Sequence, residues 1–234
     1  MGTKGNQDRK VGECVYCGEL GPVSRDHIPP SNLFAQPRPS NLITVPACDR
    51  CNNAASLDDE YFRLAITTGI DPAKFPNEFD LSLEAIHKLS DPQKRGLAKT
   101  MLSNFSKRPL PTPAGLYLGE AGALSIDAAR IRRVVSRVVR GLFFHHLGKR
   151  LSSTHTISVL SDWLSPDLPD KELLAEVQVV PDFLNSAEAR EIGSGVFCYR
   201  YRILEEEPDG SIWWLCFYDH HRFLCSTQEQ DGLA

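Results

Sequence analysis

Apolar residues recur at helical spacing in four parts of the chain. Intervals of three and four residues predict helices over 49–68, 81–89, 93–105 and 127–149. The last of these has the clearest pattern, because its apolar stripe runs from Ile131 to Leu147 and Gly148 follows as a stop signal. Gly69 ends the first helix, and Asp91-Pro92 separates the second from the third. The middle of the chain is therefore expected to be mainly helical.

Alternation of apolar and polar residues predicts strands toward the end of the chain. Strands are expected over 196–204 and 212–218, joined by the turn Pro208-Asp209-Gly210, and 223–225 can add a third. Residues 107–113 predict an extended connector, and 115–118 with 123–126 predict a small hairpin. Segments 156–164 and 173–180 fit strands or short helices equally well.

The remaining stretch, near the start of the chain, is rich in Gly and Pro, which indicates loops with only short strands near residues 23–28. The patterns together predict a flexible N-terminus at 1–12, a compact module at 13–68, a helical region at 69–155 and a mixed region at 156–234 that ends in antiparallel strands. A loop-rich module of this size cannot bury enough apolar surface to be stable alone, and a bound metal is the usual remedy.

Composition is ordinary for a globular protein, with 41% hydrophobic and 24% charged residues among 234. No apolar run is long enough for a membrane span, and no leader of charged and then apolar residues begins the chain, so we expect a cytoplasmic protein without membrane contact. Seven cysteines, an odd number, argue against a disulfide framework.

Charge is unevenly distributed along the chain. The net charge is −4, a mild argument against nucleic acid as a partner, because phosphate binding depends on Lys and Arg. Residues 126–150, however, carry a net charge of +6, so the rest of the chain carries −10. Within this basic segment, one helical face is expected to present Arg130, Arg133, Arg137 and Arg140.

Two Cys-x-x-Cys pairs lie in the compact module, as Cys14 with Cys17 and Cys48 with Cys51. Such a turn can place both sulfur atoms on one metal, and Zn²⁺ favours a closed tetrahedron of four thiolates. Because four thiolates leave no position open for a substrate, this zinc is expected to be structural. Four unrelated buried cysteines would be the alternative, which the paired spacing disfavours.

Asp26 and His27 lie between the two cysteine pairs. They could be ordinary loop residues with local hydrogen bonds, or a site in which the carboxylate holds a divalent cation and the imidazole accepts a proton. Asn52 directly follows a zinc cysteine, and its amide oxygen is a reasonable ligand for an ion of the Mg²⁺ class. Since neighbours on a strand point to opposite sides, either the backbone turns here or base and cation meet the substrate from two directions.

In this order, Cys-x-x-Cys, Asp-His-Ile-x-Pro, Asn-Leu and Cys-x-x-Cys-Asn resemble the HNH endonucleases, in the version with a four-cysteine zinc site. The resemblance covers about residues 13–56. It implies that His27 is the general base, that Asp26 and Asn52 bind a catalytic Mg²⁺ or another divalent ion, and that Asn41 orients His27. The expected fold class is α+β: a small zinc-stapled ββα-metal module, then a mainly helical region and a C-terminal antiparallel β-hairpin or sheet.

The function that the resemblance implies is metal-dependent hydrolysis of phosphodiester bonds, with nucleic acid, and DNA in particular, as the partner. Candidate phosphate contacts are Arg25, Arg38 and Arg50 beside the motif, and the four arginines of the basic helix. The basic face could equally be a solvated surface that pairs with acids such as Glu205–Glu207.

Two features depart from the usual pattern of the family. Many members have Gly-Gly before the middle Asn, where this chain has 34–40 without glycine, and many have a Lys where this chain has Ala55. Asp58, Asp59 and Glu60 follow, and such acids would weaken phosphate attraction. An inactive zinc-stapled module that binds nucleic acid or protein is therefore the alternative, although the presence of Asp26, His27 and Asn52 together favours the enzyme.

Overall fold

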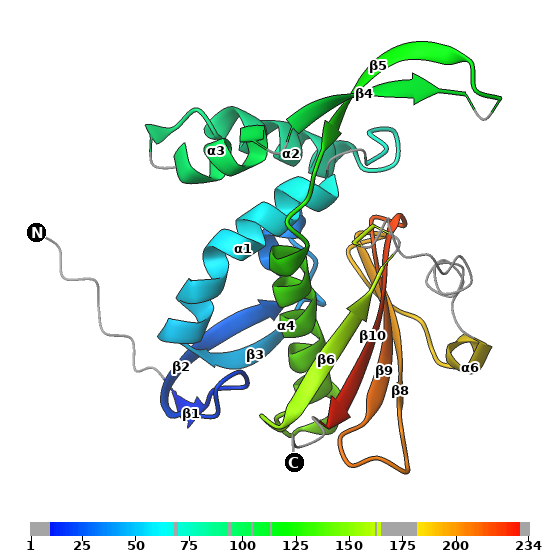
Figure 1. Cartoon of the computed structure of the whole chain (residues 1–234). Coiled ribbons are helices and arrows are strands. Elements are labelled where there is room, and N and C mark those ends of the chain that lie inside the picture. The colour runs from blue at the N-terminus through cyan, green and yellow to red at the C-terminus, as the bar shows by residue number, and fades with distance from the viewer. Residues whose placement is uncertain are drawn as a thin grey trace, which may run out of the picture.

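The computed structural model describes residues 10–67, 70–92, 95–103, 105–112, 114–161, 163–164 and 182–229. Its N-terminal part is a three-stranded antiparallel sheet in the order β1-β2-β3, followed by a long helix (Figure 1). These elements are β1 (Val11–Glu13), β2 (Leu20–Ile28), the 3₁₀ helix η1 (Ser31–Leu33), β3 (Ile43–Cys48) and α1 (Asp49–Thr67). The helix expected from residue 49 is thus confirmed, with its first turn directly after β3.

A group of elements stands above this part in Figure 1: α2 (Pro76–Lys88), α3 (Arg95–Ser103), β4 (Phe105–Pro111) and β5 (Tyr117–Leu124). Both helices agree with the sequence pattern. The small hairpin expected between 115–118 and 123–126 is wrong, because residues 117–124 form one strand that pairs with 105–111. The extended connector expected over 107–113 therefore lies largely within a paired strand. The turn lies earlier, where the side chain of Thr112 accepts from the Leu116 N–H and Gly115 has a left-handed φ of 83°.

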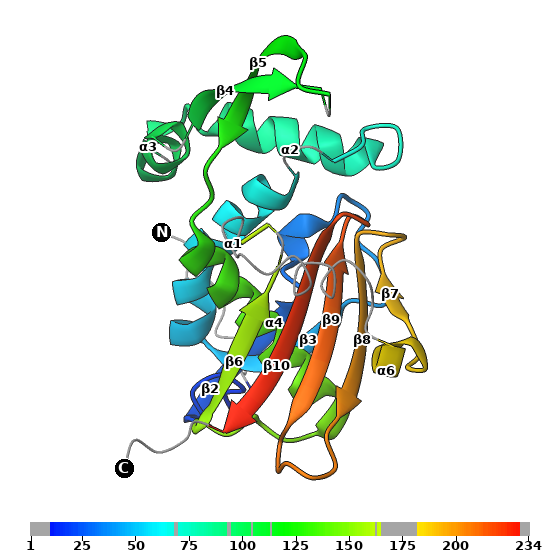
Figure 2. The ribbon, with the colours of Figure 1, turned by 45° about the vertical axis from the view of Figure 1, so that its right-hand side comes forward.

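A second sheet of five antiparallel strands forms the C-terminal part, in the order β6-β10-β9-β8-β7 (Figure 2). Its strands are β6 (His155–Leu160), β7 (Arg190–Ile192), β8 (Phe197–Ile203), β9 (Ser211–Phe217) and β10 (His221–Glu229), and the short helix α6 (Asp182–Asn185) contacts β8. Segment 156–164 therefore contributes a strand, whereas 173–180 lies outside the described residues. The third strand is longer than the expected 223–225 and pairs on both sides.

Helix α4 (Ala128–Leu147) lies between α1 and the five-stranded sheet (Figures 1 and 2). Asp127 caps its N-terminus by accepting from the N–H groups of Ala129 and Arg130, and Gly148 ends it in the left-handed conformation with φ 67°. Its apolar stripe joins residues of both sheets in one hydrophobic core. Among the described helices, none contains an apolar stretch long enough to cross a membrane.

Gly141 brings α4 into close contact with β2. A β-carbon at this position would lie 2.4 Å from Cγ1 of Ile28, so only glycine fits without a shift of the helix or the strand. Arg137 lies one turn before Gly141 on the helix, and Asp26 lies two residues before Ile28 on the strand, so each pair shares a face. The close approach of Gly141 therefore also sets Arg137 against Asp26.

Candidate metal centre and active site

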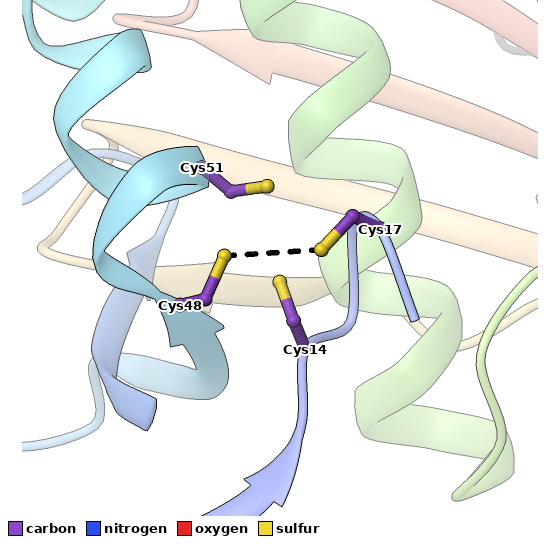
Figure 3. Close-up of side chains that lie close together, drawn as sticks. All are labelled: Cys14, Cys17, Cys48 and Cys51. Carbon is purple, nitrogen blue, oxygen red and sulfur yellow. Dashed lines mark hydrogen bonds between the residues drawn. The ribbon is translucent and has the colours of Figure 1, made fainter. Parts of the chain in front are cut away.

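The cysteines of the two Cys-x-x-Cys pairs meet at one point (Figure 3). The first pair lies in the turn after β1, and the second spans the end of β3 and the first turn of α1. All four sulfur atoms lie within 4.8 Å of one another, and Sγ of Cys17 is 3.8 Å from Sγ of Cys48. Four sulfurs about 2.3 Å from a central Zn²⁺ would be about 3.8 Å apart. The four cysteines can therefore hold a metal such as zinc.

The backbone around the first pair shapes this centre. Gly18 has a left-handed φ of 76°, and its N–H donates to the carbonyl of Cys14 at 2.8 Å. Burial raises the pKa of the Cys14 thiol, but backbone N–H groups outweigh this effect and lower that pKa to about 7. Burial and the neighbouring sulfurs raise the pKa of Cys51. A bound cation would favour the ionised form of Cys51, which is a role that a structural zinc would fill.

Asp26 is a buried carboxylate on the face of β2 that packs against α4. Its Oδ2 accepts from the hydroxyl of Tyr16 at 2.5 Å and from Nη2 of Arg137 at 2.6 Å. Tyr16 lies between the two cysteines of the first pair, and its ring also lies 5.1 Å from the Arg137 guanidinium carbon. The side chain of Asp26 is therefore held by a residue of the cysteine turn and by a cation from α4.

Asn52 faces the same cation. Its Nδ2 donates to the Ser24 hydroxyl at 3.2 Å, which leaves its Oδ1 to accept from Nη2 of Arg137 at 3.4 Å. Nη1 of Arg137 donates to Asp59 at 2.9 Å. The two residues that the sequence predicted as divalent-ion ligands are thus brought together, and a single guanidinium nitrogen contacts both.

The donor set suits a divalent cation by its chemistry, since Mg²⁺-class ions favour carboxylate and amide oxygens. Oδ1 of Asp59 is also buried and has no hydrogen-bond partner among the described residues, so oxygen capacity remains. Burial lowers the pKa of Arg137, but Tyr16, Asp26 and Asp59 outweigh it and raise that pKa. Arg137 is therefore fully charged, and its guanidinium is the cation that these oxygens hold in this structure.

The carboxyl group of Asp59 has a raised pKa. Burial raises the pKa of its carboxyl group to about 6, against the opposing effect of Arg137, and the neighbouring acids Asp26 and Asp58 add to the rise. The single positive charge of Arg137 thus does not fully compensate the carboxylates around it.

His27 lies on the other face of β2. The register is regular through this part of the strand, with Asp26 opposite Val45 and His27 opposite Thr44, so adjacent side chains project to opposite sides. The backbone does not turn here, so the alternative of a local turn is wrong. Burial and the charge of Arg38 lower the pKa of His27, while Asp26 opposes them. The imidazole is therefore neutral at pH 7, the form that a general base needs.

Asn41 and the arginines beside the motif are placed differently. The amide of Asn41 donates to the backbone carbonyl of Glu191 in β7 at 2.9 Å, at the edge of a cavity of about 700 Å³. Its predicted action on His27 stays a prediction. Arg50 pairs with Glu19 at the surface at 2.8 Å. Arg25 and Arg38 are both exposed on the module.

The arginines of α4 face acids of α1. Arg133 lies 2.7 Å and Arg130 lies 3.7 Å from carboxylate oxygens of Asp58, and Arg140 donates to the carbonyl of His155 at 3.0 Å. The acids Asp58 and Asp59 thus form ion pairs within the chain, and the acidic partners of this arginine face include Asp26 and Asp127 as well. Binding of nucleic acid by the face remains a prediction.

Sequence reasoning missed three participants in this site. Asp59 lies seven residues after Asn52, two turns along the same helix face, and that spacing could have indicated it. Tyr16 lies inside the first Cys-x-x-Cys pair, where it reads as a spacer. Arg137 was predicted to contact phosphate, but its contact with Asp26 bridges 111 residues and has no local signal.

Comparison of this chain with protein-family models, curated proteins and solved structures found no match. The resemblance to HNH endonucleases therefore rests on the motif residues themselves.

Proposed function

We propose that this chain is a metal-dependent endonuclease of the HNH type that hydrolyses phosphodiester bonds of nucleic acid, with DNA as the expected substrate. The observation that carries the proposal is that Asp26 and Asn52, from two different elements, contact one nitrogen of a single cation. The antiparallel pair β2–β3 followed by α1, with four cysteines clustered at its base, fits a zinc-stapled ββα-metal module.

Each residue has a definite task under this proposal. Asp26 and Asn52 would hold the divalent ion, which supplies charge stabilisation at the phosphate. Tyr16 and Ser24 fix the rotamers of these two ligands through the hydrogen bonds described above. Neutral His27 accepts a proton from the attacking water. His27 and Asp26 project from opposite faces of β2, so the residue that would hold the ion and the residue that would accept the proton lie on different sides of the strand.

The test replaces the proposed base. His27→Ala should lower cleavage of plasmid and single-stranded DNA in Mg²⁺ or Mn²⁺ by about 100-fold or more, because general-base catalysis is lost. Zinc content and the thermal unfolding temperature should stay close to wild type, and EDTA should abolish cleavage by both proteins. His87→Ala changes an exposed histidine on α2 and serves as the matched control. Full metal-dependent cleavage by His27→Ala would refute the assignment.

The second candidate is a zinc-stapled module that binds nucleic acid or protein without hydrolysis. The observation in its favour is that the guanidinium of Arg137 occupies the position between Asp26 and Asn52. Wild-type protein that binds DNA in a salt-dependent manner, yet cleaves neither substrate in Mg²⁺ or Mn²⁺, would favour this candidate.

A further inference from the structure

We propose that Arg137 is a built-in competitor for the divalent-ion site, so that an ion binds Asp26 and Asn52 only when the guanidinium leaves them. The inference rests on the ion site of the proposed function and adds its regulation. It assigns to α4, a helix distant in sequence from the motif, control over whether the site is open.

The first step is that guanidinium and ion need the same space. Nη2 of Arg137 lies 2.6 Å from Oδ2 of Asp26 and 3.4 Å from Oδ1 of Asn52. A Mg²⁺ ion bound to those oxygens would lie about 2.0–2.1 Å from each. The nitrogen would then overlap the ion or its water ligands, and two cations in contact would repel each other. The guanidinium of Arg137 and a divalent ion therefore cannot occupy the site between Asp26 and Asn52 at the same time.

The second step is that Arg137 does not leave without a replacement. Its side chain is 12% exposed, and it pairs with two carboxylates that are themselves largely buried, those of Asp26 and Asp59. Removing one partner of such a group leaves uncompensated buried charge, which is costly. A divalent ion can supply the lost charge and more, so the guanidinium is expected to leave in exchange for the ion.

The third step is that the side chain has a place to go. Arg137 lines a cavity of about 490 Å³ between α1 and α4, where the small side chains of Ala54 and Ala55 leave room. Its Nε is buried without a hydrogen-bond partner in the described part of the chain, so the closed position is not fully satisfied. A change of rotamer into this cavity would open the site without movement of α4.

The experiment measures Mn²⁺ binding to protein already saturated with zinc, by isothermal titration calorimetry and by electron paramagnetic resonance of Mn²⁺. Arg137→Gln should bind one Mn²⁺ about ten-fold or more tightly than wild type, because the competitor is gone. Arg130→Gln is the matched control: it removes an arginine two turns away on the same helix, which pairs with Asp58 and Asp127 and is not among the residues that line this cavity, and it should bind Mn²⁺ like wild type.

A second variant covers the possibility that Arg137→Gln does not fold without an ion. Asp59→Asn combined with Arg137→Gln has the net charge of wild type and keeps Asp26 and Asn52, so it should fold and still bind Mn²⁺ more tightly than wild type. Adding Asp26→Asn to Arg137→Gln should remove the gain, which assigns it to this site.

Wild-type affinity in both variants, no Mn²⁺ binding by either, or a gain that survives Asp26→Asn would overturn the inference. These outcomes are separate from those of the proposed function. If the Arg137 variants bind Mn²⁺ more tightly but neither they nor wild type cleave DNA, the competitor role stands and the nuclease function is refuted. If wild type cleaves DNA but the variants bind Mn²⁺ no more tightly than wild type, the nuclease function stands and the competitor role is refuted.

Discussion

Tyr16 couples the cysteine cluster to the carboxylate of the candidate active site. It lies within the first Cys-x-x-Cys turn, and its hydroxyl donates to Asp26. Any metal that fixes this turn therefore also fixes the orientation of Asp26. Burial and the charge of Asp26 raise the pKa of Tyr16, so the phenol stays protonated and keeps its role as a donor. At the scale of single residues, the cysteine cluster and the proposed ion site are thus connected through one side chain.

We expect Cys14→Ser to lower the zinc content from about one ion per chain to near zero and to unfold the module around residues 10–56, because the module depends on the metal. Elemental analysis of the purified protein and thermal unfolding followed by circular dichroism measure both effects. Cys198→Ser, in the five-stranded sheet, should retain the zinc. If Cys14→Ser keeps wild-type zinc content, the cysteine cluster is not the zinc site.

Local spacing determined which site residues could be predicted. The clustering of the four cysteines was predictable, because the spacing of each Cys-x-x-Cys pair reflects one local turn. The position of Arg137 was not, because its contact with Asp26 depends on how α4 crosses β2. The acids Asp58 and Asp59 were expected to weaken phosphate attraction, but both form ion pairs with arginines that are distant in sequence.

Helix α4 is the element that positions the cation. Its amphipathic pattern, the Asp127 cap and Gly148 define its length, and the glycine at position 141 defines how closely it approaches β2. The tyrosine hydroxyl of Tyr61 on α1 accepts from the Asp127 N–H at 2.7 Å and holds the start of α4 beside α1. Both ends of the contact between α4 and the module are therefore fixed.

Gly141→Ala should destabilise the protein by about 1–3 kcal/mol, because the added methyl group overlaps Ile28 and forces α4 away from β2. Urea unfolding measures the loss. In a double-mutant cycle, Ile28→Ala should show favourable coupling with Gly141→Ala. Gly96→Ala in α3 is the control, since a β-carbon there meets nothing within 4 Å, and the better helix former should stabilise by up to about 1 kcal/mol. Equal effects at both glycines would contradict this account of the helix–strand contact.

Helices with a regular spacing of apolar residues could be predicted from the sequence. Strands whose extended form depends on pairing with another strand could not. Helices α1 and α4 follow their apolar spacing. Strand β5 contains Gly119 and Gly122, which read as a turn, yet it stays extended because β4 supplies its hydrogen bonds. Strand β6 could not be distinguished from a helix by period alone, and its pairing with the far C-terminal β10 is not local.

At the scale of the whole molecule, α4 also connects the N-terminal module to the five-stranded sheet. His146 near its end lies against β8: its Nε2 forms a 3.0 Å hydrogen bond with the Tyr199 hydroxyl, and its ring stacks on Tyr201 at 4.4 Å. Burial, His145 and Arg190 lower the pKa of His146 to about 4. The imidazole in this contact between helix and sheet is therefore neutral at pH 7.

Stability should consequently depend on pH through His146. Because its folded-state pKa lies below the ordinary value of about 6.5, the contribution is complete above pH 6.5 and is lost as the pH falls toward 4. His146→Gln should show a shallower loss of unfolding free energy across this window than wild type. Chemical denaturation at several pH values measures it, and equally steep curves for the two proteins would contradict the role of His146.

The overall arrangement could be predicted least. Composition and period indicated a mixed α and β chain, as observed, but not that one core would contain residues of both sheets with α4 between them. This packing depends on whether the surfaces of already formed helices and strands are complementary in shape. Hydrophobic patterns in a single sequence do not show which of these surfaces contact one another.

The close approach of Gly141 to Ile28 has a consequence for how this protein can change over generations. Every glycine codon is a single nucleotide from an alanine codon, so a common point mutation would disturb the place of Arg137 without altering any residue of the candidate site. Such a lineage could recover through a smaller side chain at position 28. We therefore expect a substitution at position 141 to be tolerated best together with a smaller side chain at position 28.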